Sequence, residues 1–210
     1  MARVVLAAVA AGIGLTGLGL TGLDSKGAAQ ESSPQASPVA SATPEKRVET
    51  SVPAGFELVW SDEFDTPGLP DPAKWKFDTF RNKDGWFNNE KQYYAAARLE
   101  NSRVEDGRLI IEARKEDLGS ARFADCGGQE YSSARLMTQG LGDWTYGFFE
   151  IRAKLPCGVG TWPAIWMLPS DPNVKWPAGG EIDIMEHVGF EPGVIPHSLH
   201  TTAFNISRGT

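Results

Sequence analysis

The chain has 210 residues, enough for one domain with appended segments. It carries 20 basic and 27 acidic side chains, for a formal net charge of −7. It therefore lacks the basic surplus of proteins that bind nucleic acid or anionic lipid. Every Trp, Tyr and Phe lies after residue 50, so we expect the hydrophobic core only in the later part of the chain.

The first 29 residues have the order of a secretory signal peptide. One basic residue, Arg3, precedes an apolar run from Val4 to Leu23, and Gly27, Ala28 and Ala29 follow. This order predicts cleavage after Ala29 and a secreted or periplasmic protein with no membrane contact after cleavage. The length of the apolar run leaves an uncleaved anchor as the alternative, although its Gly and Thr residues weaken that interpretation.

Residues 30–54 are rich in Ser, Pro and Ala and contain no aromatic side chain. Such a segment cannot bury enough apolar surface to fold, so it predicts a disordered linker. The single expected domain therefore covers residues 55–210.

Within this domain, short apolar runs alternate with Gly, Pro, Asn and Asp, and turn signals such as Asp106-Gly107 separate them. No stretch of a dozen residues has a helical period. Many short strands joined by turns predict an all-β fold, an antiparallel β-sandwich or jelly roll. The expected strands are Glu57–Trp60, Trp75–Thr79, Arg108–Arg114, Ser132–Thr138, Gly147–Lys154, Ala164–Leu168, Glu181–Glu186 and Ser198–Phe204.

The two cysteines, Cys126 and Cys157, both lie in Gly-rich turns. In an exported chain this pair predicts one disulfide bond, and two free thiols are the alternative. Neither cysteine has neighbours typical of a metal site. His197 and His200 are three apart on an expected strand and would point to opposite faces, so we expect no metal site there.

The most informative stretch contains three carboxylates, Glu181, Asp183 and Glu186, among Ile and Met residues. This alternation predicts a strand with one polar face. Glu181 and Asp183 share that face because they are two residues apart. Glu186 joins them only if a β-bulge near Ile184-Met185 adds one residue. The two glutamates could then approach the carboxyl separation of about 5 Å that retaining glycosidases use.

An edge strand with solubilising acids is the simpler alternative. Three nearby indoles, Trp162, Trp166 and Trp176, argue against it, since aromatic faces beside paired carboxylates suit a sugar.

The stretches WPAIW at 162–166 and EIDIME at 181–186 resemble the signature of glycoside hydrolase family 16, specifically its laminarinase branch of endo-β-1,3-glucanases. The resemblance covers about residues 56–204. Further segments that resemble the family, in family order, are Leu58–Phe64, Asn88–Tyr94, Glu100–Asn101, Glu105–Leu109, Ser133–Leu136 and Tyr146–Glu150.

The resemblance implies a jelly roll of two curved antiparallel sheets with a substrate cleft on the concave face. Family domains continue beyond the strand that contains His200, so we expect this chain to be truncated at its C-terminus. The expected protein is a monomer whose partner is a β-glucan polysaccharide. A non-catalytic glucan-binding module, or an enzyme acting on mixed-linkage glucan or a galactan, are the alternatives.

In this family Glu181 would be the nucleophile, Glu186 the general acid and base, and Asp183 a supporting charge whose crowding raises a pKa within the trio. Catalysis would need no cofactor, although a structural calcium is common in the family. The residues that would line the sugar subsites are Asn89, Arg135, Trp162, Trp166 and, in a less defined role, His200.

Overall fold

Strands make up nearly all regular structure in the computed structural model, which describes residues 2–10, 52–119 and 123–208. All of these belong to one unit, Met1–Gly12 with Val52–Thr210, and the linker up to residue 51 lies outside the described residues. The strands are β1 (Ala2–Ala10), β2 (Lys76–Phe77), β3 (Gln92–Tyr94), β4 (Ser102–Glu105), β5 (Arg108–Ile111), β6 (Arg114–Lys115), β7 (Tyr131–Ser133), β8 (Arg135–Met137), β9 (Thr161–Pro169), β10 (Glu181–Glu186) and β11 (Ser198–His200), and the short 3-10 turns are η1 (Phe87–Asn89) and η3 (Ile206–Arg208).

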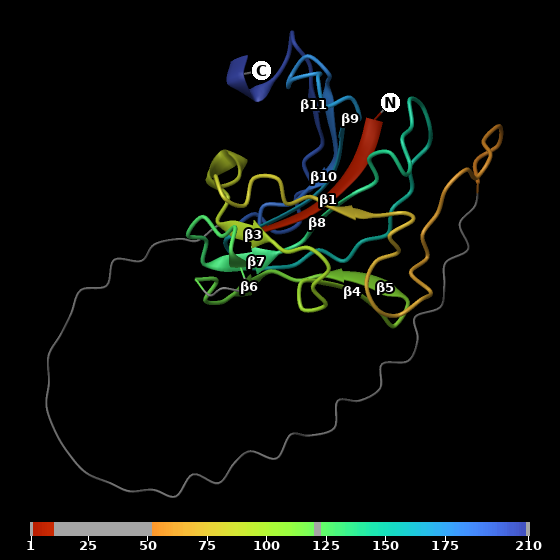
Figure 1. Cartoon of the computed structure of the whole chain (residues 1–210). Helices are drawn as coiled ribbons and strands as arrows, with labels where there is room; N and C mark the ends of the chain where they lie inside the picture. Colours follow the sequence, from red (N-terminus) through yellow and green to blue (C-terminus); the bar gives the residue numbers. More distant parts are fainter. Residues whose placement is uncertain (1, 11–51, 120–122, 209–210) are drawn as a thin grey trace, which may run out of the picture. The chain divides into compact units, whose positions relative to one another are not determined.

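A six-stranded antiparallel sheet carries the stretch of three carboxylates. Its strand order is β11-β10-β9-β1-β8-β2 (Figure 1). Side chains alternate along β9: Ile165 and Met167 are buried on one face, while Trp162 and Trp166 occupy the other. The buried pair packs with Trp144, Phe149, Ile184 and Met185. The apolar face therefore fixes which side of β9 and β10 remains available to a ligand.

Strand β1 lies between β8 and β9, where it pairs with β9 from Ala2↔Pro169 to Ala10↔Thr161. The sequence predicted a secretory signal over residues 1–29, of which Ala2–Ala10 is the described part. A continuous run of small and β-branched apolar residues suits a strand inside a sheet as well as a signal peptide. Cleavage after Ala29 stays a prediction, and it would remove β1 from the sheet.

Two smaller sheets accompany the large one. Strand β3 pairs in parallel with β7, which also pairs with β6, and β4 and β5 form a separate hairpin. Asp106 and Gly107 connect the hairpin with φ values of 52° and 69°. Positive φ at both central residues matches the right-handed twist of the flanking strands, so the turn predicted at this dipeptide is confirmed. Near β3, the side chains of Tyr93, Ala95, Leu118 and Phe123 form a second apolar cluster.

Four expected strands differ from the structure. The expected strand Arg108–Arg114 is divided between β5, in the two-stranded sheet, and β6, in the three-stranded sheet. The single strand Ser132–Thr138 is split at Ala134, because β7 belongs to the three-stranded sheet and β8 to the six-stranded one. Chains that cross from one packed sheet to another bend in this way. Glu57–Trp60 and Gly147–Lys154 were predicted as strands, but neither forms a ladder with any described strand. Ring contacts hold both segments to the fold instead: Trp60 meets Trp75 at 5.6 Å and Trp144 at 5.5 Å, and Phe149 meets the same Trp144 at 5.7 Å.

The predicted disulfide bond is wrong, because both cysteines are free thiols. Cys126 packs against the apolar cluster around Tyr93, and its Sγ lies 3.3 Å from Oε1 of Gln129. The same oxygen accepts a hydrogen bond from the backbone N–H of Gly127, which fixes this turn. Cys157 is exposed on the loop that precedes β9. Among the described residues, no helix combines the length and the apolar character needed to span a bilayer.

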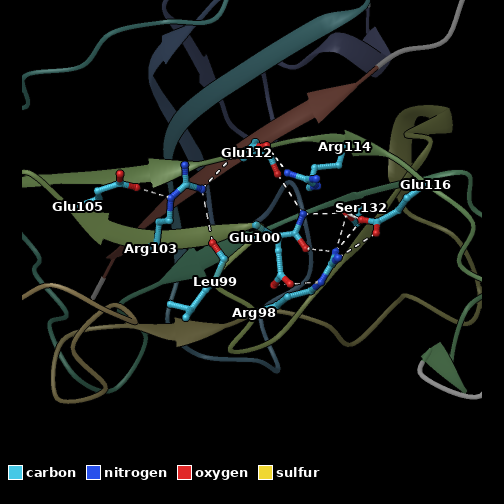
Figure 2. Close-up of polar contacts among 10 residues, drawn as sticks. Arg98, Leu99, Glu100, Arg103, Glu105, Glu112, Arg114, Glu116 and Ser132 are labelled. Carbon is cyan, nitrogen blue, oxygen red and sulfur yellow. Dashed lines mark hydrogen bonds and ion pairs between the residues drawn. The ribbon is translucent and has the colours of Figure 1, made fainter. Parts of the chain in front are cut away.

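An ion-pair cluster connects the β4–β5 hairpin to the three-stranded sheet (Figure 2). The guanidinium of Arg98 donates to both carboxylate oxygens of Glu116, at 2.6 and 2.9 Å. Ser132 and Asn101 complete the surroundings of this pair. The hydrogen bonds from Arg98 are the main cause that lowers the pKa of Glu116. The Arg103–Glu105 pair is more exposed and should contribute less.

Glu116→Gln should lower the free energy of unfolding at pH 7 by about 1–3 kcal/mol, because it removes the 2.6 Å ion pair of the largely buried Arg98 and leaves it only the longer one, of 3.5 Å, to Glu100. Since the pKa of Glu116 is lowered in the folded state, its contribution is present above the ordinary value of 4.5 and disappears as pH falls through the folded value. Urea unfolding at pH 7 and under acid conditions measures both effects. Glu105→Gln is the exposed control, and equal losses in the two variants would contradict the assignment.

Candidate active site

A β-bulge places the three carboxylates of β10 on one face. Strand β10 pairs with β9 at Asp183↔Trp166, but the register then shifts, and the next pairs are Met185↔Ile165 and Glu186↔Ala164. Paired residues point to the same side of a sheet, so Asp183 and Glu186 share the face of Trp166 and Ala164. Glu181, two residues before Asp183, lies there too. The bulge predicted near Ile184-Met185 is confirmed.

Backbone groups around the bulge have partners outside β9. Nδ1 of His197 lies 2.6 Å from the carbonyl oxygen of Ile184, the extra residue, and bonds to it in the tautomer that carries Nδ1–H. The N–H of Glu186 donates to the carbonyl of Pro196, and the N–H of His187 donates to that of Pro163. These contacts satisfy polar groups that a bulge removes from the regular ladder. His197 is therefore a structural partner of the bulge.

Each carboxylate has a different neighbour. Nε1 of Trp176 donates a hydrogen bond to Glu181, and Nε1 of Trp162 donates one to Glu186 at 2.8 Å. Asp183 lies between the two glutamates in sequence and is only 5% exposed, with Nε2 of His200 at 3.3 Å from its Oδ2. Two glutamates held by indoles thus flank a buried aspartate.

Burial and charge crowding shift the acidity of this group. Desolvation is the first cause that raises the pKa of Asp183 to about 7, and the charges of Glu181 and Glu186 act in the same direction. Burial also raises the pKa of Glu181, which shares a hydrogen bond with Asp183. The carboxyl groups whose pKa is raised are Asp183 and Glu181, and burial, not the charge crowding expected from the sequence, is the larger cause. An acid that holds its proton near neutral pH, as Asp183 does, suits a site of proton transfer.

Two glycines set where β10 begins. A Cβ on Gly179 would lie 2.1 Å from Cγ of Pro169, at the end of β9, so only glycine allows the turn to pass this close. Gly180 has φ of 79°, a left-handed conformation that glycine adopts without strain. The Gly-Gly turn therefore places Glu181 directly beside the end of β9.

Arg135 lies on β8 between two indoles. Its guanidinium carbon is 5.0 Å from the ring centre of Trp86 and 4.7 Å from that of Trp166. Nε lies 3.0 Å from Oδ2 of Asp78, an ion-pair distance, although its direction is too poor for a hydrogen bond. Arg135 is only 4% exposed. The stack fixes the orientation of Trp166, the residue paired with Asp183 across the strands.

Four of the five predicted sugar-lining residues meet near the carboxylates. Trp162 and His200 contact them directly, and Trp166 and Arg135 form the adjoining stack. The fifth, Asn89, lies on an exposed loop with φ of 58°. Direct sugar contact by these five residues stays a prediction.

Sequence reasoning gave no site role to several neighbours. Trp176 was part of the indole cluster but was not predicted to contact Glu181. Asp78, Trp86 and Glu90 were missed, although Trp86 and Glu90 flank the Asn88-Asn89 pair and could have been suspected from that position. Burial is the main cause that raises the pKa of Glu90, which accepts hydrogen bonds from Gln92 and Tyr94.

The part of the chain that the structure describes contains no group of three His, Cys, Asp or Glu side chains placed to hold a metal ion. The carboxylates of β10 are instead occupied by indoles and a histidine.

Comparison with known proteins gives the same assignment as the geometry. Residues 120–208 match the family model described as "XgeA-like, catalytic GH16 domain". A curated "Beta-glucanase" from Rhodothermus marinus is 57% identical over 158 residues, which cover 74% of this chain and 52% of that protein. The chain belongs to glycoside hydrolase family 16. It spans about half the length of that relative.

Solved structures of family 16 members also match. A mutant of SCLam, a non-specific endo-beta-1,3(4)-glucanase, was co-crystallised with 1,3-beta-D-cellotriosyl-glucose and presents 1,3-beta-D-cellobiosyl-glucose at its active site. It is 61% identical, with a TM-score of 0.71, over 74% of this chain and 59% of that one. The laminarinase from Rhodothermus marinus is 57% identical, with a TM-score of 0.66, over 73% and 59%. The predicted all-β jelly-roll class is therefore confirmed.

Asp183→Asn should flatten the pH dependence of stability. The pKa of Asp183 is raised from 3.8 to about 7, so between these values the folded state binds more protons than the unfolded state. The stability that this group contributes therefore falls as pH rises through that window. Above about pH 7 the chain carries the full cost of burying the ionised carboxylate. Asparagine carries no such charge. Urea midpoints from mildly acidic to mildly alkaline pH measure the slope.

Asp84→Asn, in an exposed loop, is the matched control and should keep the slope of the unsubstituted chain. If Asp183→Asn also keeps that slope, ionisation of Asp183 does not control stability in this range.

Proposed function

We propose that this family 16 chain is the part of a secreted, endo-acting β-1,3-glucanase that carries its catalytic residues, and that it cleaves laminarin-type glucan with retention of configuration. One observation supports this most strongly: the bulge in β10 brings Glu181, Asp183 and Glu186 to the same face, beside three indoles. Two carboxyl groups that flank the same bond are the requirement of glycoside hydrolysis, and the retaining course is proposed from the resemblance to the family.

In the first step, the carboxylate of Glu181 attacks the anomeric carbon of a glucosyl unit. The bond from that carbon to the bridging oxygen breaks, and Glu186 donates its proton to this oxygen, so the shorter glucan leaves as an alcohol. The enzyme now holds a glycosyl ester on Glu181. The hydrogen bond from Trp176 orients Glu181 for this attack.

In the second step, Glu186 is a carboxylate and takes a proton from water. The resulting hydroxide attacks the same carbon, the ester bond breaks, and Glu181 returns to its ionised form. Both steps invert the anomeric carbon, so the product keeps the original configuration. These steps use protein carboxyl groups and water, without a metal or organic cofactor.

Asp183 has a supporting role in this scheme. Its raised pKa lets it hold a proton near neutral pH and share it with Glu181 in the hydrogen bond between them. When Glu181 becomes an ester and loses its charge, one of the two charges that, after burial, raise the pKa of Asp183 disappears. Asp183 can then ionise, with His200 at 3.3 Å as its partner.

The proposed substrate is β-1,3-glucan, in line with the relatives named laminarinase and beta-glucanase. The name of SCLam, a 1,3(4)-glucanase, supports activity on mixed-linkage glucan as well. We further propose that the protein acts as a monomer and reaches the outside of the cell by the predicted signal peptide. Reducing-sugar assays on laminarin, curdlan, lichenan and agarose test the substrate, and preferential turnover of agarose would contradict the proposal.

The two glutamates should respond differently to substitution and rescue. Glu181→Gln and Glu186→Gln should each reduce kcat on laminarin by several orders of magnitude, because neither group has a substitute. On an aryl glycoside with a good leaving group, Glu186→Ala should still form the ester and then stall. Azide, which needs no base, should restore turnover and give a β-glycosyl azide.

Glu181→Ala lacks the nucleophile, so azide would attack directly and give the α-azide. Product configuration by NMR measures the outcome. An α-azide from Glu186→Ala would show that the two roles are reversed.

A further inference from the structure

Two large apolar side chains are exposed on the loop between β2 and β3. Phe80 is 66% exposed and Phe87 is 52% exposed. Their rings are 6.5 Å apart and tilted by 49°, so they form one small aromatic surface. Single exposed apolar residues are common, and two adjoining exposed rings offer a ligand an apolar surface to cover.

This aromatic pair, Phe80 with Phe87, continues the stack that starts at the carboxylates. Trp166, paired with Asp183 across the strands, touches Arg135 at 4.7 Å, and Arg135 touches Trp86 at 5.0 Å. The ring of Phe80 then meets Trp86 edge to face at 5.3 Å. A series of stacked flat groups, of which Arg135 and Trp86 are buried, thus connects the candidate active site to the exposed pair.

The loop that carries the pair is fixed to the fold. The buried Asn82 accepts hydrogen bonds from Nε1 of Trp86 and the N–H of Tyr94, and donates to the carbonyl of Tyr94. Arg81 donates to the carbonyl of Gly85 while its guanidinium lies 4.4 Å from the ring centre of Phe87. Rings that are positioned before binding lose little conformational entropy when a ligand arrives.

Polar groups surround the exposed rings. Arg81 lies over one side of Phe87, and Asn88 and Asn89 follow it in left-handed conformations, with φ of 55° and 58°. Asparagine adopts this region more readily than most residues, so the two positions turn the loop directly after Phe87. A flat apolar surface edged by amide and guanidinium donors fits a sugar, which has an apolar C–H face and a rim of hydroxyl groups.

We propose that Phe80 and Phe87 form a distal subsite that stacks one glucosyl unit of the bound chain, remote from the bond that is cleaved. This inference rests on the proposed function, since the ligand is the same β-glucan. The distal subsite would make affinity depend on the length of the chain. Short oligosaccharides end before they reach it, whereas long ones gain one additional stacking contact.

The test compares laminaritriose with laminarihexaose, titrated by calorimetry into full-length chains that carry Glu181→Gln to prevent hydrolysis. In this background hexaose should bind more tightly than triose. Adding Phe87→Ala should weaken hexaose binding by about threefold to tenfold and leave triose unchanged, as expected for one lost aromatic contact. Phe87→Tyr keeps the ring and should restore hexaose affinity.

Tyr146→Ala is the control, because this side chain is 92% exposed on a segment without a contact to the stack. It should change neither affinity. Among the described ring contacts, the Phe87 ring meets only Phe80 and Arg81. The chain with Glu181→Gln and Phe87→Ala should therefore have the same thermal transition as the chain with Glu181→Gln alone.

The possible failures are distinct. If the Glu181→Gln chain binds neither oligosaccharide, the proposed function is wrong and the subsite falls with it. If that chain binds both but Phe87→Ala changes neither affinity, or weakens both equally, the distal subsite is wrong while the proposed function stands.

Discussion

One extra residue in β10 determines which side chains meet at the site. Without the register shift after Asp183, Glu186 would follow the period of two and point toward Ile165 and Met167, into apolar packing. With it, Glu186 joins Glu181 and Asp183 on the open face. The same shift turns Met185 inward, where it packs with the buried residues of β9. Packing on one face and acid placement on the other therefore depend on a single backbone irregularity.

The aromatic residues around the acids do more than add apolar surface. Trp162 and Trp176 present N–H groups to two different glutamates, so each carboxyl has its own donor. Trp166 contributes a ring that the guanidinium of Arg135 contacts at 4.7 Å from the ring centre. Asp183 is buried on the same face, and burial raises its pKa to about 7. The three carboxyl groups therefore have different surroundings, which the proposed roles of nucleophile, acid and supporting group require.

Much of the site could be predicted because its signals are local. The acidic period in Glu181–Glu186 and the nearby indoles require no knowledge of distant contacts, and even the bulge follows from the odd spacing of Glu186. Partners that are far apart in sequence were harder: the Arg135–Asp78 pair and the stack on Trp86 depend on tertiary packing. No pattern in residues 78–90 shows which ring meets which.

The fold class was predicted from short runs and turns, but several details were not. A continuous stretch such as Ser132–Thr138 gives no sign that Ala134 separates two sheets. The run Ala2–Ala10 is apolar enough for a signal peptide and for a strand, so composition alone cannot choose between them. The cysteines looked paired because both lie in turns, yet a turn does not determine which other turn lies near it.

The central claim is that Glu181 is the nucleophile on a face shared with its acid partner. An activated fluoro-sugar derivative of laminaribiose forms the glycosyl ester quickly and releases it slowly, so the intermediate accumulates. Peptic digestion and tandem mass spectrometry then locate the added sugar. The structure predicts one sugar per chain, attached to Glu181. A label on Glu186, or on neither glutamate in a chain that hydrolyses glucan, would contradict the account.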